Sequence, residues 1–173
     1  MGRIVKSAVA GAIGGIVGTL CMDLVWYRRF RQAGGEQSFG PWETSEGTTN
    51  FEEAPAPART AKAVADLMGV ELPDSSARAL NNAVHWLTGI GWGKAHGLVA
   101  RATGGSNPLG GLVTAVVAWA TSYVVLPRLG VYEKMSEYER DVLWQDLSAH
   151  LAYGSALGTV YWLLTREPGT SRP

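Results

Sequence analysis

Stretches without charged residues alternate with charged segments along this chain. Residues 7–22, 109–126 and 147–165 contain no Asp, Glu, Lys or Arg, whereas 79–100 is interrupted by Asn, His and Lys side chains. A helix needs about 20 mostly apolar residues to cross the hydrocarbon core of a bilayer, and these stretches are too long for β-strands. The pattern therefore predicts four membrane-spanning helices, at about residues 5–27, 79–100, 109–126 and 146–165.

The segments between the predicted spans have a different character. Residues 34–57 are rich in Gly, Thr, Glu and Pro and show no apolar period, so we expect a loop there. From 57 to 68 the apolar side chains recur on one helical face, which predicts a short amphipathic helix on the membrane surface or against the bundle. The predicted fold class is all-α, an integral-membrane four-helix bundle with one amphipathic surface helix.

Composition changes this picture little. The 173 residues include 15 basic and 15 acidic side chains, so the formal net charge is zero and there is no electrostatic basis for a nucleic-acid partner. A mean hydropathy near neutral is also typical of a soluble helical bundle, which is the alternative interpretation. Here, however, the neutral mean combines apolar spans with charged connections. Aromatic residues precede basic ones near the ends of two predicted spans, Trp26 before Arg28 and Trp162 before Arg166. This arrangement is typical of the ends of helices that cross a bilayer, so the predicted partner of the chain is the lipid bilayer.

The first span and the orientation need separate comment. A basic start before an apolar run is typical of a signal peptide, but no small-residue cleavage site follows this run, so we interpret it as a retained helix. The distribution of Lys and Arg over the connections leaves both membrane orientations open.

Two segments share one spacing of polar and small residues. Residues 81–96 and 146–161 both follow the pattern [Asn/Asp]-x3-His-x3-Gly-x3-Gly-x2-[His/Tyr], and each comes after another hydrophobic span. A pattern that recurs at one interval indicates an internal duplication. We therefore predict two tandem helical hairpins of the same orientation, a parallel internal repeat of the kind found in some transporters.

Glycines at four-residue intervals allow helix backbones to approach closely inside a membrane. The first span contains two overlapping pairs of this kind, and each repeated segment contains one more. The candidate helix-packing residues are Gly11, Gly14, Gly15, Gly18, Gly89, Gly93, Gly154 and Gly158. We expect a tight bundle whose polar residues face inward.

Polar and ionisable side chains within membrane spans are candidate functional residues. In this chain they are Asp23, Asn81, His85, His96, Asp146, His150 and Tyr161. One interpretation is a shared polar site that handles protons or ions, since His titrates near neutral pH and Asp can pair with it. The other is that Asn81 and Asp146 each hydrogen-bond the histidine one turn further on, and that these groups hold the helices together.

The sequence offers little enzymatic chemistry. It contains no nucleophile elbow, P-loop, dinucleotide fingerprint or zincin motif. Its single cysteine, Cys21, lies within the first span, which excludes a cysteine-based zinc site and an intramolecular disulfide. Haem ligation by His85 and His150 is a geometric alternative supported only by the two histidines. We expect no enzymatic activity, no catalytic residue, no cofactor and no metal site.

With these motifs in view, the chain resembles the small bacterial inner-membrane proteins of the YagU family. The similar features are the first span with its long Pro-containing connection, the stretch His85-Trp86-Leu87-Thr88-Gly89 and the stretch His150-Leu151-Ala152-Tyr153-Gly154. The resemblance implies a multi-pass protein of the bacterial inner (plasma) membrane and, for some members, a link to stress such as acid resistance. It implies no catalytic residue and no cofactor.

Two functions follow as expectations. The first is a non-enzymatic structural, adaptor or envelope-stress role, in which the polar groups stabilise the bundle. The alternative is a small oligomeric transporter or channel with a His/Asp polar path. That alternative needs a homo-oligomer, because four helices alone enclose little volume.

Overall fold

The computed structural model describes residues 2–105 and 107–166, which form helices and connections and contain no strand. The four long helices are α1 (Arg3–Gln32), α4 (Ala77–Thr103), α5 (Leu109–Val125) and α6 (Arg140–Thr165). The short ones are α2 (Phe39–Glu43), α3 (Ala56–Leu67), η1 (Asp74–Ser76), η2 (Leu126–Leu129) and η3 (Met135–Glu137). The all-α class predicted from the sequence is confirmed.

Each predicted span coincides with one long helix, although the third ends one residue beyond α5; α1 and α4 extend beyond both predicted ends, and α6 begins before its predicted start. The prediction of an unstructured loop over 34–57 is wrong for α2, which lies inside it. This single helical turn is held by its own rings, because Phe39 and Trp42 pack against Tyr27 of α1 with ring centroids 5.2 and 5.4 Å apart. Contacts between distant segments leave no apolar period in the sequence of residues 34–57, so the sequence pattern did not predict this helix.

The predicted amphipathic helix is α3, which packs against the start of α4. Ala58 of α3 is fully buried in a small cluster with Phe51, Ala54 and Ala77. Its opposite face is exposed at Leu67. The structure therefore places α3 against the bundle.

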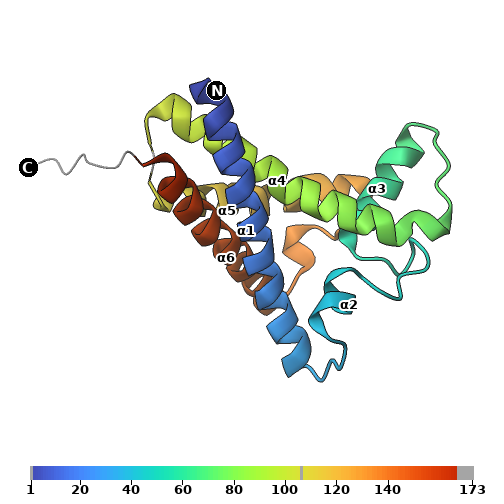
Figure 1. The fold of residues 1–173 in the computed structure, drawn as a ribbon. Helices are drawn as coiled ribbons and strands as arrows, with labels where there is room; N and C mark the ends of the chain where they lie inside the picture. The colour runs from blue at the N-terminus through green and yellow to red at the C-terminus, as the bar shows by residue number, and fades with distance from the viewer. Residues whose placement is uncertain (1, 106, 167–173) are drawn as a thin grey trace, which may run out of the picture.

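The core of the molecule is α1, which lies between α4 and α6 and runs antiparallel to both (Figure 1). Two faces of α1 carry glycine. On one face a Cβ added to Gly11 or Gly15 would collide with the backbone of α4, and on the other a Cβ at Gly14 or Gly18 would collide with α6. All eight candidate packing glycines are buried at helix contacts. The absence of side chains there allows backbone contact between the helices.

Two tyrosines of α6 add hydrogen bonds at the same contacts. The hydroxyl of Tyr153 donates to the carbonyl oxygen of Gly89 at 2.6 Å, and that of Tyr161 donates to the carbonyl oxygen of Gly97 at 3.2 Å. Both bonds are buried, so their donors and acceptors have no access to water. α1, α4 and α6 are thereby joined into one unit, and α5 packs against α6 through Gly111.

The long helices do not stay together over their full length. The N-terminal half of α4 diverges from α1, and α2 and α3 lie beside this diverging part (Figure 1). The glycines are in the part where the helices touch. The part where they separate contains the polar residues described below.

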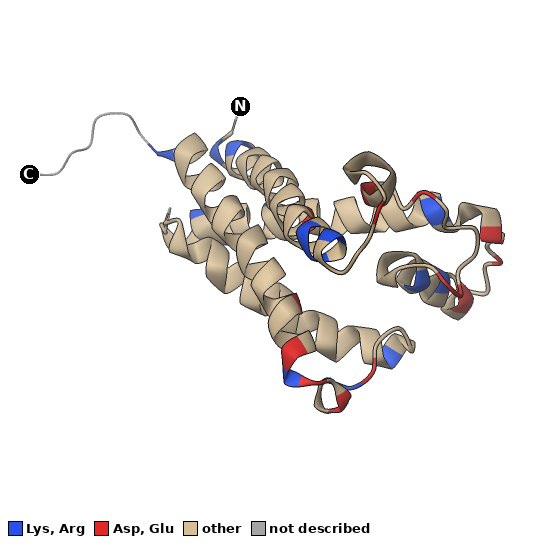
Figure 2. Ribbon diagram, turned by 90° about the horizontal axis from the view of Figure 1, so that it is seen from below, with Lys and Arg blue, Asp and Glu red and all other residues tan. Residues whose placement is uncertain are grey.

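The charge distribution differs between the helices and their connections. Figure 2 shows Lys, Arg, Asp and Glu gathered at helix ends and connections, with the central parts of the long helices almost free of them. Among the described residues, two segments are long and apolar enough to cross a membrane, Arg3–Gln32 and Leu109–Leu129. Large apolar side chains are exposed on both, for example Ile13 and Leu20 on α1 and Val113 on α5.

Candidate functional site

Where α4 diverges from α1, the helices form a cavity of about 570 Å³. Its wall draws on all four long helices, on α2, and on the start of α3. Trp26, Trp42 and Trp92 form part of its apolar lining. Its acidic and imidazole groups are Asp23, Glu43, His85, Asp146 and His150, and the described lining residues include no Lys or Arg. Three carboxyl groups and two imidazoles facing one cavity favour the entry of a cation.

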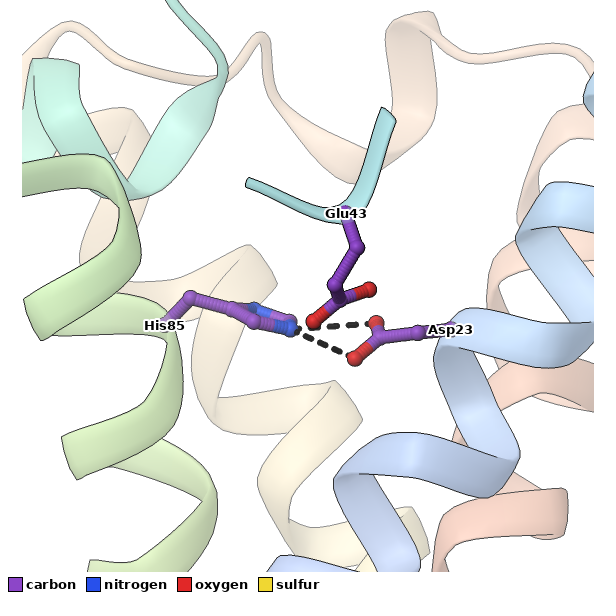
Figure 3. Close-up of side chains that lie close together, drawn as sticks. All are labelled: Asp23, Glu43 and His85. Carbon is purple, nitrogen blue, oxygen red and sulfur yellow. Dashed lines mark hydrogen bonds and ion pairs between the residues drawn. The ribbon is translucent and has the colours of Figure 1, made fainter. Parts of the chain in front are cut away.

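The first polar cluster joins α1 to α4. Nε2 of His85 lies 3.0 and 3.1 Å from the two carboxylate oxygens of Asp23, and the pair is close to Glu43 of α2 (Figure 3). Asp23 is 4% exposed, so its carboxylate depends on these neighbours for stabilisation. One ligand atom from each of Asp23, Glu43 and His85 can be chosen so that all three lie within 4.8 Å of one another, a cluster able to hold a metal ion.

Glu43 reaches this cluster because the C-terminal end of α2 is anchored to both α1 and α4. On the α1 side, Trp42 packs against Tyr27 and Phe30. On the α4 side, Arg78 and Asn82 donate hydrogen bonds to the carbonyl oxygen of Thr44, each at 3.0 Å. Glu43 lies between Trp42 and Thr44 in the sequence, so it is held between α1 and α4.

Asn81 has a positioning role at the same place. Its amide nitrogen donates to the hydroxyl of Ser45 at 2.8 Å, and Ser45 adopts a positive φ of 50° at the turn that follows α2. The prediction that Asn81 hydrogen-bonds His85 is wrong, since the partner of His85 is Asp23 from the other helix. The amide of Asn81 instead reaches across to the loop that presents Glu43.

The carboxyl group of Glu43 is electrostatically unfavourable in its ionised form. Burial raises its pKa from 4.5 to about 7, the negative charge of Asp23 adds to the rise, and His85 opposes it. Its Oε1 is buried and has no hydrogen-bond partner among the described residues. Glu43 therefore takes up a proton at higher pH than an exposed glutamate does.

This shift predicts a pH-dependent effect of Glu43→Gln. The folded protein holds a proton on Glu43 that the unfolded chain releases near pH 4.5, so the stabilisation from Glu43 is complete below 4.5 and is lost as pH rises through about 7. Gln resembles the protonated carboxyl group. We expect the variant to unfold at the wild-type temperature at pH 4 and at a higher temperature at pH 8, by thermal denaturation in detergent with EDTA.

The matched control is Glu46→Gln, a nearby exposed carboxylate. It should leave the unfolding temperature unchanged at both pH values. An equal effect of Glu43→Gln at pH 4 and pH 8 would contradict the raised pKa.

The second polar pair lies on α6. Nδ1 of His150 is 3.3 Å from the carboxylate of Asp146 and 2.9 Å from its carbonyl oxygen, so the pairing one turn apart agrees with the sequence. The other carboxylate oxygen of Asp146 accepts a hydrogen bond of 3.0 Å from the hydroxyl of Tyr123 on α5. Both Asp146 and His150 line the same cavity as Asp23 and His85.

The remaining two candidates, His96 and Tyr161, lie outside the cavity lining. Their rings are in edge contact with centroids 5.1 Å apart, and Nδ1 of His96 is hydrogen-bonded to Thr114 at 2.9 Å. Both residues are buried, at 5% and 2% exposure. They connect α4, α5 and α6 where these helices pack through their glycines, so their surroundings indicate a structural role.

The structure thus brings five of the seven candidates to one cavity and adds Glu43, which the sequence did not indicate. Glu43 follows Phe-Gly-Pro-Trp in a segment without apolar period. The aromatic pair in that segment is the one local signal that it packs against a helix. Neither Phe39 nor Trp42 identifies the carboxylate next to them as part of a site.

The chain was compared with family models, curated proteins and solved structures, and none of them matches it. Membership of the YagU family therefore stays a prediction.

Proposed function

We propose that this protein is a multi-pass protein of the bacterial inner membrane that binds small cations in its cavity and carries them across the bilayer as a small oligomeric transporter or channel. The observation that carries the proposal is the cavity wall, which combines three carboxyl groups and two histidines without Lys or Arg among its described residues. Ionisable groups at membrane depth are costly and commonly mark ion pathways. The proposal includes no catalytic step.

The membrane assignment is supported by the surface of the helices. Apolar side chains are exposed along α1 and α5, where a soluble protein would have polar ones. The guanidinium of Arg29 stacks over Trp26 at 5.0 Å, and that of Arg166 stacks over Trp162 at 4.9 Å. Aromatic and basic residues paired in this way are typical of helix ends at a membrane interface. The inner-membrane location rests on the resemblance to the YagU family.

We infer four spans in two tandem hairpins, α1–α4 and α5–α6. α4 and α6 have 27 and 26 residues, enough to cross the bilayer at about 1.5 Å per residue. The glycine contacts support the repeat, because Gly15 packs on the carbonyl of Gly89 and Gly111 packs on the carbonyl of Gly154. Gly89 and Gly154 are matched positions of the repeated pattern.

The two His–Asp pairs provide the polar path of the proposal. Asp23 and His85 lie on the α1–α4 side of the cavity, and Asp146 and His150 lie on the α6 side. A cation in the cavity has carboxylate and imidazole ligands on both sides. We expect the path to be completed in a homo-oligomer, since a single four-helix chain encloses little volume.

A flux assay tests this function. Purified protein is reconstituted into liposomes, and the fluxes of H⁺, K⁺ and Mn²⁺ are recorded separately with dyes inside the vesicles. We expect flux of at least one cation above that of protein-free liposomes, and its loss to background in His85→Ala and in His150→Ala. Thr159→Ala, at an exposed position on the same helix as His150, is the control and should keep wild-type flux.

The proposal fails if the wild type carries none of the three ions, or if both histidine variants keep full flux. Recovery of the protein in the soluble fraction without detergent would overturn the membrane assignment itself.

A structural, adaptor or envelope-stress role is the second candidate. The observation that favours it is that each histidine already has a partner, His85 in Asp23 and His150 in Asp146. In that case both pairs hold helices together. The histidine variants would then lower the unfolding temperature, while wild-type liposomes would show no cation flux.

A further inference from the structure

We infer that Asp23, Glu43 and His85 form the binding site of one divalent transition-metal ion, of the class that includes Zn²⁺, Mn²⁺ and Fe²⁺. The inference rests on the proposed function for the uptake of cations by the cavity. It adds the identity of the cation class and of its three ligands.

The distances within the cluster fit an ion. Nε2 of His85 is 3.0 Å from Oδ1 of Asp23. Ligands bound to a metal ion at about 2.0–2.2 Å are roughly 3.0–3.5 Å apart when they are neighbours in its coordination shell. The three ligand atoms lie within 4.8 Å of one another, and Figure 3 shows the carboxyl group of Glu43 directed at the other two side chains.

The charge of the cluster also calls for a cation. When a metal ion displaces the protons of Glu43 and His85, the two carboxylates and the neutral imidazole carry two negative charges, and no Lys or Arg is found among the described residues of the cavity wall. A divalent ion neutralises these charges. It also gives a partner to Oε1 of Glu43, which is buried without a hydrogen bond among the described residues. Unpaired polar atoms of this kind are rare in folded proteins.

The donor set selects the class of metal. An imidazole together with carboxylates suits Zn²⁺, Fe²⁺ and Mn²⁺, whereas Mg²⁺ and Ca²⁺ prefer oxygen ligands alone. Three protein ligands leave at least one coordination position free. Because Asp23, Glu43 and His85 all line the cavity, that free position faces it. An ion held in this way can be released into the cavity.

The second polar pair provides an internal control. Asp146 and His150 offer two ligand residues, and the third neighbour of Asp146 is the hydroxyl of Tyr123. A phenol that donates a hydrogen bond is a poor metal ligand at neutral pH. The pair should therefore not form a comparable site on its own.

The test is equilibrium binding to the purified full chain in detergent after EDTA treatment and its removal. Zn²⁺ and Mn²⁺ are titrated by calorimetry, with Mg²⁺ as the comparison ion. We expect one Zn²⁺ per chain, and affinity reduced at least about a hundredfold in Glu43→Gln and in His85→Gln, since even outer-shell changes commonly cost 10–100-fold. Glu46→Gln, which removes an exposed carboxylate outside the cavity wall, should retain the wild-type affinity.

A measurement on the wild type alone guards against variants that do not fold. Histidine modification by diethylpyrocarbonate is mapped by mass spectrometry, and Zn²⁺ should protect His85 while leaving His150 reactive. No saturable Zn²⁺ binding, equal affinity in Glu43→Gln, or no protection of His85 would each overturn the inference.

The binding and flux results separate the two proposals. Zn²⁺ binding without cation flux supports the metal site and overturns transport. Cation flux in a protein that binds no Zn²⁺ supports transport and overturns the metal site.

Discussion

Replacing Gly93 by leucine is expected to separate α1 from α4 and to lower the stability of the protein by about 3 kcal/mol. A Cβ at Gly93 would meet the carbonyl oxygen of Gly11, and it would lie 2.8 Å from Cα and 2.9 Å from N of Gly15. These are backbone atoms, which cannot rotate away as a side chain can. Overpacking of a close contact typically costs about 1–3 kcal/mol, and a contact between backbones belongs at the upper end.

Thermal unfolding in detergent measures this effect. A loss of about 3 kcal/mol corresponds to a fall of roughly 6–12 °C in the unfolding temperature of a chain of this size. The control is Gly91→Leu, two residues away on the same helix, where an added Cβ has no atom within 4 Å. That variant gains helix propensity without a collision. Equal unfolding temperatures for the two variants would show that the helices do not pack in this way.

The second large effect is expected from His85→Leu. This variant leaves the neighbouring carboxyl groups of Asp23 and Glu43 without the imidazole that pairs with Asp23 and opposes the charge of both. Removing one partner of a fully buried ion pair costs about 3–5 kcal/mol. A quarter of the His85 side chain is exposed, at 26%, so water screens part of this effect and we expect about 2 kcal/mol at pH 8.

The part of this effect that comes from Glu43 should grow as pH rises. His85 lowers the pKa of Glu43, so its removal raises that pKa above the value of about 7 found in the wild type. The folded variant then holds a proton that the unfolded chain releases near pH 4.5, and its stability falls as pH rises from there. At pH 5 Glu43 is protonated and no longer repels Asp23, so the loss of stability that remains there, with EDTA present, is that of the His85–Asp23 ion pair.

Two further variants test the cause. Adding Glu43→Gln to His85→Leu removes one of the opposed charges and should restore most of the stability lost at pH 8. His150→Leu is the comparison at the second pair, where Asp146 keeps its hydrogen bond from Tyr123. A pH-independent loss in His85→Leu would mean that packing, and not charge, accounts for the role of the imidazole.

The long helices and the packing glycines could be predicted because their signals are local. Apolar length identifies a helix that can cross a membrane, as for Arg3–Gln32 and Leu109–Leu129. Four-residue glycine spacing places Gly11 and Gly15 on one helical face whatever the partner helix is. The sequence does not identify that partner. The structure assigns Gly11 and Gly15 to α4, and Gly14 and Gly18 to α6.

The candidate site shows where such local rules stop. The pairing of His150 with Asp146 spans one helical turn, so it could be predicted from the sequence. By the same rule Asn81 should have paired with His85, yet Asn81 bonds Ser45 and His85 bonds Asp23. The partners of Asn81 and His85 come from segments far away in the chain. Their proximity depends on the angle at which α4 diverges from α1.

By itself, the sequence determined the helical class, the positions of the long helices, the glycine faces and four of the five residues proposed for the cation path. Tertiary structure alone decided that Asp23 pairs with His85, that both His–Asp pairs line one cavity, and that Glu43 joins the first of them. The physical reason is that apolar period and glycine spacing act within one helix. The position of Glu43 depends on a helix of five residues that is held by ring contacts and hydrogen bonds to two other helices.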